Sequence, residues 1–305
     1  MGPVRSLSVV ALVSLISLRA EAGADKAWAA AKANLPKDTT VLVGMDLAQL
    51  TQSTLFNFAF PMALSQQPDV KAGLELVKST CQIDPMKTVQ GVVIGTDDVQ
   101  KHGAIYIAVD GVDQAKLVSC LEAVAKAKGK DGKVSVKTDG KITELGIGDK
   151  TIYLTWIGTN VLVLPLDFSS KADLQAWSGT KGLAKSKVAK GMARVNTGGA
   201  LWAVSAVPKE LDAKMKMKLG YGAITLASGT LAADLHVQLG NAADAKAAAE
   251  KAQKELSTLA ASPDLAANLK TVLSSVTVRA AADDVAVKGS IAESDVLSLV
   301  TALMK

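Results

Sequence analysis

The sequence is poor in aromatic residues, histidine and cysteine, and this scarcity excludes several classes of function. Phe, Trp and Tyr make up 4% of its 305 residues, and there are two histidines and two cysteines. No C-x-x-C, H-E-x-x-H or EF-hand pattern occurs, so no metal site is predicted. The glycine-flanked serine of many hydrolases and the glycine-rich phosphate loop are also missing. We therefore expect neither a cofactor nor an enzyme.

Long apolar runs are missing too, apart from one at the N-terminus. Arg5 precedes the run "SLSVVALVSLISL", and two small-x-small patterns follow it, Ala20–Ala22 and Ala22–Ala24. This order is typical of a secretory signal peptide. We interpret residues 1–24 in this way, with cleavage after Ala22 or Ala24, the alternatives being a membrane anchor or a buried helix. The mature chain is then predicted to be periplasmic or secreted, with no transmembrane span.

The chain has only a small excess of positive charge. Its 34 basic and 29 acidic residues give a net charge of +5. Removing Arg5, Arg19 and Glu21 with the signal peptide changes this by −2 and +1, which leaves +4. Such an excess favours loose attraction to anionic surfaces and is too small to indicate nucleic-acid binding. Envelope lipid, polysaccharide or another protein remain open as partners.

The two cysteines predict a disulfide. Cys81 ends one expected helix, in "LVKSTCQIDP", and Cys120 lies inside another, in "AKLVSCLEAV". An even number of cysteines in an exported chain favours a bond between them, and this bond would join the two helices. Two buried thiols or a redox pair are the alternatives, although the missing C-x-x-C pattern argues against redox work.

Hydrophobic periodicity predicts an α+β protein made of two related halves. The stretches "TNVLVLPLDFSSKADLQAW" (159–177) and "DDVAVKGSIAESDVLSLV" (283–300) both show a turn, an alternating strand, a polar link and an amphipathic helix. Each half contains strand, helix, strand, strand and helix in the same order, followed by a hairpin and a last helix. The core order β-α-β-β-α-β is that of the ferredoxin-like, split βαβ unit, which predicts an antiparallel sheet with helices on one face.

The expected organisation follows from this repeat. Residues 25–180 form the first half, residues 181–198 a basic linker and residues 199–305 the second half. The halves could pack sheet on sheet, join edge to edge or leave a concave apolar surface, and a concave surface would be a ligand site. The sequence does not choose among these arrangements.

The linker contains the strongest basic run of the chain. Its apolar residues Leu183, Val188, Met192 and Val195 fit one face of an amphipathic helix. Its basic residues are then candidates for contact with an anionic envelope lipid or polysaccharide, with a solvated linker as the plainer interpretation. These residues are Lys181, Lys185, Lys187, Lys190 and Arg194.

The start of the expected mature domain resembles a known group of proteins. The segment "LPKDTTVLVGMDLAQLTQSTLF" (35–56) is similar to the LPxDT…DLxxLxxSxLF opening of a loose group of exported bacterial proteins of uncharacterised function. This resemblance implies an exported α+β fold and supplies no activity or functional residue. The matching positions are Leu35, Pro36, Asp38, Thr39, Asp46, Leu47, Leu50, Ser53, Leu55 and Phe56.

Few residues near the two histidines in the sequence could form a catalytic or metal site with them. His102 follows Asp97 in a turn, where it is either a solvated residue or a general base. His236 alternates with Asp234 and Gln238, which predicts a polar face of a strand. Acidic residues gather at other turns, which local turn preference explains without an active site.

Three functions are compatible with these observations. The first is a non-enzymatic exported protein with a binding or scaffolding role in the cell envelope. The second is a carrier of a lipid or another apolar ligand, which is motivated by aliphatic strands such as "VLVLPL" (161–166). The third is a hydrolase with an unrecognised site, for which the sequence offers the least support.

Overall fold

A computed structural model of the chain describes residues 23–97, 102–128, 134–166, 170–172, 174, 179, 181–208, 216–263, 265 and 267–303. Its strands are β1 Val41–Asp46, β2 Val89–Thr96, β3 Gly103–Val109, β4 Val134–Asp139, β5 Ile142–Ile147, β6 Lys150–Ile157, β7 Val161–Leu166, β8 Leu201–Ala206, β9 Met217–Ala227, β10 Thr230–Leu239, β11 Thr277–Ala281 and β12 Asp284–Ala292. Its helices are α2 Gly23–Asn34, α3 Leu47–Leu50, α4 Thr54–Ser65, α5 Pro68–Cys81, α6 Pro85–Thr88, α7 Gln114–Lys128, η1 Leu183–Lys185, α9 Ala189–Met192, α11 Ala242–Ala260, α12 Ala267–Ser275 and α13 Glu293–Leu303.

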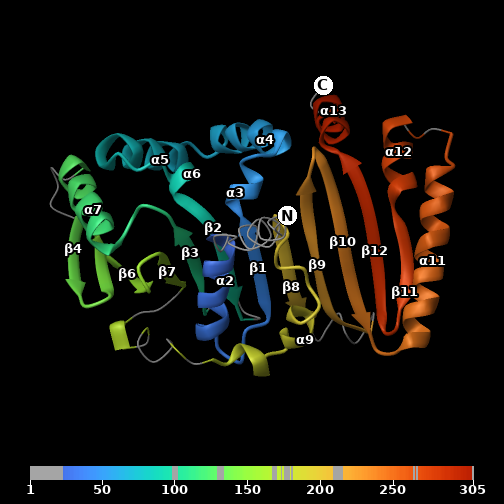
Figure 1. Cartoon of the computed structure of the whole chain (residues 1–305), viewed down its shortest axis with the longest axis horizontal. Coiled ribbons are helices and arrows are strands. Elements are labelled where there is room, and N and C mark those ends of the chain that lie inside the picture. The colour runs from blue at the N-terminus through green and yellow to red at the C-terminus, as the bar shows by residue number, and fades with distance from the viewer. Residues whose placement is uncertain are drawn as a thin grey trace, which may run out of the picture.

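All of these strands belong to one antiparallel sheet. Their order is β11-β12-β10-β9-β8-β1-β2-β3-β7-β6-β5-β4 (Figure 1). The α+β class and the antiparallel sheet are therefore as predicted. The split βαβ pairing is wrong, because β1 pairs directly with β2 and no third strand lies between them.

The two halves join edge to edge through β1 and β8. These strands pair antiparallel, with Val43 opposite Ala203. Outward from this pair, the order β1-β2-β3-β7-β6 corresponds to β8-β9-β10-β12-β11, and β5 and β4 extend the first half. This is the order that a duplication predicts, and a common origin of the halves stays a hypothesis. Of the three arrangements left open by the sequence, the chain adopts the edge-to-edge one.

One face of the sheet is closed by α2 and by residues 183–195, which precede β8. Small residues allow α2 to lie against β2, since a Cβ atom on Gly91 would lie 2.4 Å from Ala24 Cα. Leu35 and Leu42 are fully buried beneath this helix. Val93, Tyr106, Val163, Val204 and Trp202 continue the same core across both halves. We call this side the closed face.

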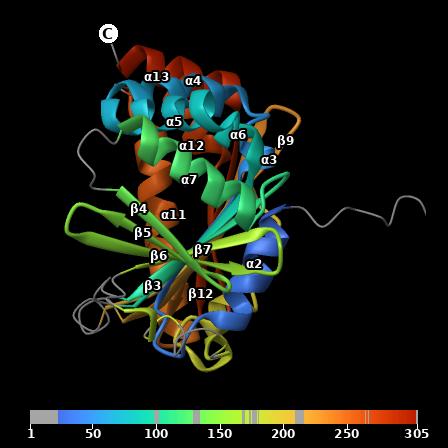
Figure 2. The same cartoon turned by 90° about the vertical axis from the view of Figure 1, so that its left-hand side faces the viewer.

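The other face carries helices mainly near its two edges. Figure 2 shows α2 on one side of the sheet and α7 and α11 on the other. A core cluster joins Cys120 of α7 to Trp156 of β6, and another joins Ala245 and Ala249 of α11 to Val285 of β12. Helices α4, α5 and α13 lie together at one end of the molecule (Figures 1 and 2).

A candidate ligand-binding face of the sheet

Burial alternates along the central strands, whereas polarity does not. In β1, Leu42 is fully buried and its neighbours Val41 and Val43 are only half-buried. Thr96 and Ser205, the partners of Val41, are polar, whereas most residues with the same orientation in the adjacent strands are also apolar and partly exposed. We call their surface the open face, and it consists of Val41, Val43, Met45, Val92, Ile94, Ile105, Ile107, Leu164, Leu201, Ala203, Ile224, Leu226, Leu231 and Leu235.

Strand register aligns these side chains into rows that cross the boundary between the halves. Leu164 pairs with Ile105, which pairs with Ile94, and Ile94 pairs with Val43. The row continues through Ala203 and Gly222 to Leu235. Antiparallel strands lie about 4.8 Å apart, so this row is roughly 29 Å long. None of its members is charged.

The helices beside the open face leave its centre outside the buried core. On one side, α7 packs near Trp156 and Leu162; on the other, α11 packs near Val237 and Val285. In the part of the chain that the structure describes, no open-face residue belongs to a buried core cluster. Leu235 remains 46% exposed.

An uncovered apolar sheet face of this kind can bind apolar ligands. An antiparallel sheet that faces water on one side ordinarily alternates apolar with polar residues, and the central strands here do not. Extended apolar patches on soluble domains mark sites of contact with ligands, membranes or other proteins. The open face has no charged group at its centre, so it would select ligands by the apolar area that they can bring into contact with it.

The sequence signal for this site was only partly recognised. The string "VLVLPL" motivates the carrier hypothesis, and in β7 it places Val161 and Val163 on the closed face and Leu162 and Leu164 on the opposite side. Strands "TVLVGMDL" and "GAIYIAVDG" carry the same signal, apolar residues on both sides, which could have identified the whole face.

A polar cluster lies on the closed face of the second half. Tyr221 Oη donates to Asp284 Oδ2 at 2.6 Å, and Arg194 Nη1 donates to the same oxygen at 2.9 Å. Burial, followed by the hydrogen bond to Asp284, raises the pKa of Tyr221 to about 12. The bond with Tyr221 and the charge of Asp284 raise the pKa of Arg194. Arg194 thus holds the linker against β12.

His236 shares its face of β10 with Asp234 and Gln238, but the surface position that this polar pattern predicts is wrong, because its side chain is only 18% exposed and lies on the closed face. Its Nε2 lies 2.8 Å from Asp234 Oδ1, its ring stacks on Tyr221 at 4.7 Å, and Gln238 shares its face of β10. His236 Nδ1 is buried and has no hydrogen-bond partner among the described residues.

The basic run does not form the expected amphipathic helix. Residues 181–195 instead contain the short turns η1 and α9, because the apolar positions turn into the core: Leu183 and Val188 are buried, and Met192 and Val195 pack against the closed-face cluster. Lys181, Lys185, Lys187 and Lys190 are exposed, and Arg194 is paired with Asp284 as described above.

This linker and α2 also enclose a shallow pocket of about 830 Å³. Trp28, which packs edge-on against Trp202 at 5.2 Å, forms one wall, and Leu183 and Met192 form the other. Lys32 and Lys181 also line this pocket. Lys181, one of the basic residues predicted to contact an anionic ligand, thus lines this pocket.

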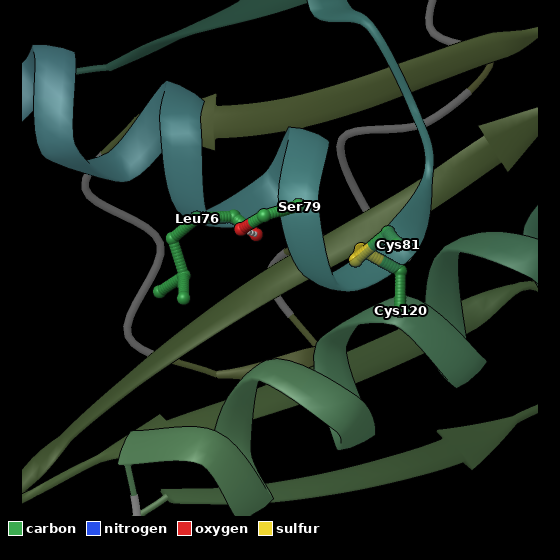
Figure 3. The surroundings of a disulfide bond; sticks show 4 residues. All are labelled: Leu76, Ser79, Cys81 and Cys120. Carbon is green, nitrogen blue, oxygen red and sulfur yellow. Dashed lines mark hydrogen bonds between the residues drawn. A yellow bond between two sulfur atoms is a disulfide. The ribbon is translucent and has the colours of Figure 1, made fainter.

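The predicted disulfide is present. Cys81 and Cys120 are bonded, with their Cα atoms 5.0 Å apart, and they join the end of α5 to the middle of α7 (Figure 3). Beside it, Ser79 Oγ donates to the carbonyl oxygen of Leu76 at 3.2 Å within α5.

The turn carboxylates are not brought together. His102 Nδ1 lies 3.3 Å from Asp97 Oδ2 in an exposed turn, and Asp139 pairs with Lys171. Asp283 pairs with Gln238 and Arg194 at the other side of the sheet. Among the residues described, no group of three His, Cys, Asp or Glu side chains could hold a metal ion.

Comparisons with known proteins assign no family. No family model and no curated protein matches the chain. Among solved structures, it is similar to crystal forms III and IV of TP0453, with TM-scores of 0.46 and 0.48 and 8% sequence identity. These alignments cover 90% and 89% of this chain and 97% and 95% of the other. A similarity at this level carries no functional argument.

Proposed function

We propose that this protein is an exported, non-enzymatic envelope protein that binds an apolar ligand, such as the acyl chains of a lipid, on the open face of its sheet. The observation that supports this proposal is the row of uncharged, mostly aliphatic residues that crosses both halves. Water in contact with such a surface is unfavourable by roughly 25 cal/mol per Å², so a ligand that covers it is stabilised.

The shape of the surroundings also favours an extended apolar ligand over a compact polar one. Helices α7 and α11 lie towards opposite edges of the sheet on the open side, which leaves the long row between them. The open-face positions contain no charged residue, and polar ligands would therefore lose hydrogen bonds to water without replacement. No helix in the described ranges is long and apolar enough to cross a bilayer.

Export is the second part of the proposal. The disulfide is compatible with an oxidising compartment, and the start of α2 favours one of the two cleavage sites. Ala24 is only 8% exposed and lies against Gly91, so cleavage after Ala24 would remove a packed residue. Cleavage after Ala22 would leave α2 intact. N-terminal sequencing of the mature protein is expected to begin at Gly23, and a start at Asp25 or later would contradict this assignment.

The binding proposal is tested with the mature protein and a fluorescent fatty acid. Charged substitutions in the open face, Ala203→Glu and Leu235→Glu, are expected to weaken binding at least roughly tenfold, because a ligand would bury an unpaired carboxylate. Both positions are exposed, so the fold should tolerate them. The matched control is Leu259→Glu on α11, where the leucine is 51% exposed outside the open face.

The outcomes separate the alternatives. Loss of binding in the two open-face variants, with unchanged binding in the control, supports the proposal. A wild-type protein that binds no fatty acid, and that carries no lipid by native mass spectrometry when recovered from its own envelope, would overturn it. A protein that then cross-links to another envelope protein through the open face would be a scaffold.

A further inference from the structure

We propose that the end of the molecule formed by α4 and α13 rests on a lipid bilayer surface. This inference goes beyond ligand binding on the open face and depends on a different set of residues. It begins with the composition of α4 and its surroundings. Residues 47–68 form a stretch of 22 positions without a charged side chain, and they contain three of the four phenylalanines in the chain.

An apolar helix without charge is normally buried, yet α4 is not. None of its twelve residues is buried, and Phe58 is 37% exposed. Val70, at the start of the adjacent α5, is 51% exposed. A helix that is apolar on all sides ordinarily lies in a protein core or in a membrane. We therefore expect a membrane surface to cover this end of the molecule.

Several polar side chains of this end are hydrogen-bonded within the chain, while the charged residues Asp69, Lys71 and Asp295 are exposed around the apolar helix. In and before α4, Thr51, Asn57 and Ser65 donate side-chain hydrogen bonds to the carbonyl oxygens of Leu47, Thr51 and Met62. In α13, Ser298 and Thr301 donate to the backbone one turn earlier, at 2.9 and 2.8 Å. Hydroxyl and amide groups bonded in this way lose little on transfer from water to the boundary of a bilayer.

The two helices are held together by a buried carboxylate. Glu293, the first residue of α13, is 6% exposed, and its Oε2 accepts hydrogen bonds from Ser53 Oγ and Leu55 N at 3.0 Å each. This carboxylate binds the N-terminus of α4, so the position of α4 relative to α13 is already fixed in the free protein. Figures 1 and 2 both show α4 and α13 side by side at this end.

Length and charge favour a bilayer surface over a spanning segment or a charged partner. A helix of twelve residues is about 18 Å long, which is shorter than the roughly 20 residues needed to cross the hydrocarbon core. It would lie in the plane of the interface, as amphipathic surface helices do. Since α4 supplies no charge, its binding should depend on apolar contact and little on anionic lipid or ionic strength.

The test is flotation of the full mature protein with phosphatidylcholine vesicles, repeated with vesicles containing phosphatidylglycerol and at high salt. Wild type is expected to float with both vesicle types, with less than a twofold change on adding salt. Phe58→Glu combined with Val70→Glu is expected to reduce the floated fraction at least roughly fivefold, because it places two carboxylates in the interface. Leu259→Glu, with a similarly exposed leucine, is the control and should float like wild type.

The result separates this inference from the open-face proposal. Ala203→Glu should still float. The variant Phe58→Glu/Val70→Glu should still bind the fluorescent fatty acid in the absence of vesicles, which also shows that it is folded. Three outcomes overturn the inference: no flotation of wild type, equal flotation of the double variant, or binding only to anionic vesicles at low salt. A dimer in sedimentation analysis that the double variant abolishes, without vesicle binding, would assign this end to a second copy of the chain.

Discussion

Tyr221 and Asp284 show how single residues couple the linker to the second half. Asp284 is 5% exposed and receives the hydroxyl of Tyr221 and the guanidinium of Arg194 on one oxygen. The sequence separation between Arg194 and Asp284 is 90 residues. Sequence reasoning therefore grouped Arg194 with the neighbouring lysines, whereas the ion pair holds its side chain on the sheet.

The raised pKa of Tyr221 predicts a pH dependence at alkaline pH. An unfolded tyrosine ionises near pH 10, whereas the pKa of Tyr221 is about 12 in the fold. Because the folded pKa is the higher one, the neutral hydroxyl stabilises the protein fully below about pH 10, and this stabilisation is lost as the pH rises through about 12. An absorbance titration of tyrosinate should show a component near pH 12.

This component should disappear in the variant Tyr221→Phe. The thermal stability of the Tyr221→Phe protein at neutral pH should fall, because Asp284 Oδ2 loses one of its two hydrogen-bond donors. An unchanged titration curve in this variant would show that the assignment to Tyr221 is wrong.

At the scale of elements, strands and helices were largely predictable, and their partners were not. Residues 53–80 show this: apolar residues at helical spacing lie in α4 and α5, and Pro68 begins α5, whereas Pro61, of a residue type that usually breaks a helix, lies inside α4. The two expected disulfide-linked helices correspond to α5 and α7. The linker was the exception, since periodicity alone cannot distinguish a surface helix from turns whose apolar residues enter a core.

Removal of the disulfide tests the role of the α5–α7 connection. The double variant Cys81→Ser/Cys120→Ser is expected to lower the free energy of unfolding by about 2–4 kcal/mol, since the bond restricts the unfolded chain. Denaturant unfolding measures this change. Hydrogen exchange should increase first in α5 and α7, which this bond and their shared cluster hold together. Equal exchange throughout the chain would contradict a local role.

At the scale of the whole molecule, the two halves depend on one close contact between β1 and β8. Gly44 lies opposite Trp202, and a Cβ atom on Gly44 would lie 2.1 Å from the indole Cε2. The indole of Trp202 is 2% exposed and belongs to the core shared by both halves. The missing side chain at position 44 therefore allows the indole of Trp202 to pack directly over β1 at the junction of the two halves.

Gly44→Ala is expected to destabilise both halves together. Overpacking at a filled core position costs about 1–3 kcal/mol, and we expect a single unfolding transition at a lower temperature. Gly73→Ala is the matched control, because no atom lies within 4 Å of its added Cβ and alanine favours the helix α5. If Gly44→Ala unfolded in two separate steps, the halves would be independent domains.

The sequence by itself determined the α+β class, most of the strands and the disulfide, whereas helix α2 was not expected from it. These features depend on local periodicity, on turn residues and on the small number of cysteines, all of which can be read along the chain. Only the tertiary structure decided that the halves join edge to edge, that β1 pairs with β2, and that the central strands keep an open apolar face. Pairing and exposure depend on which distant side chains fit together, as Gly44 and Trp202 do, and strand periodicity carries no information about such contacts.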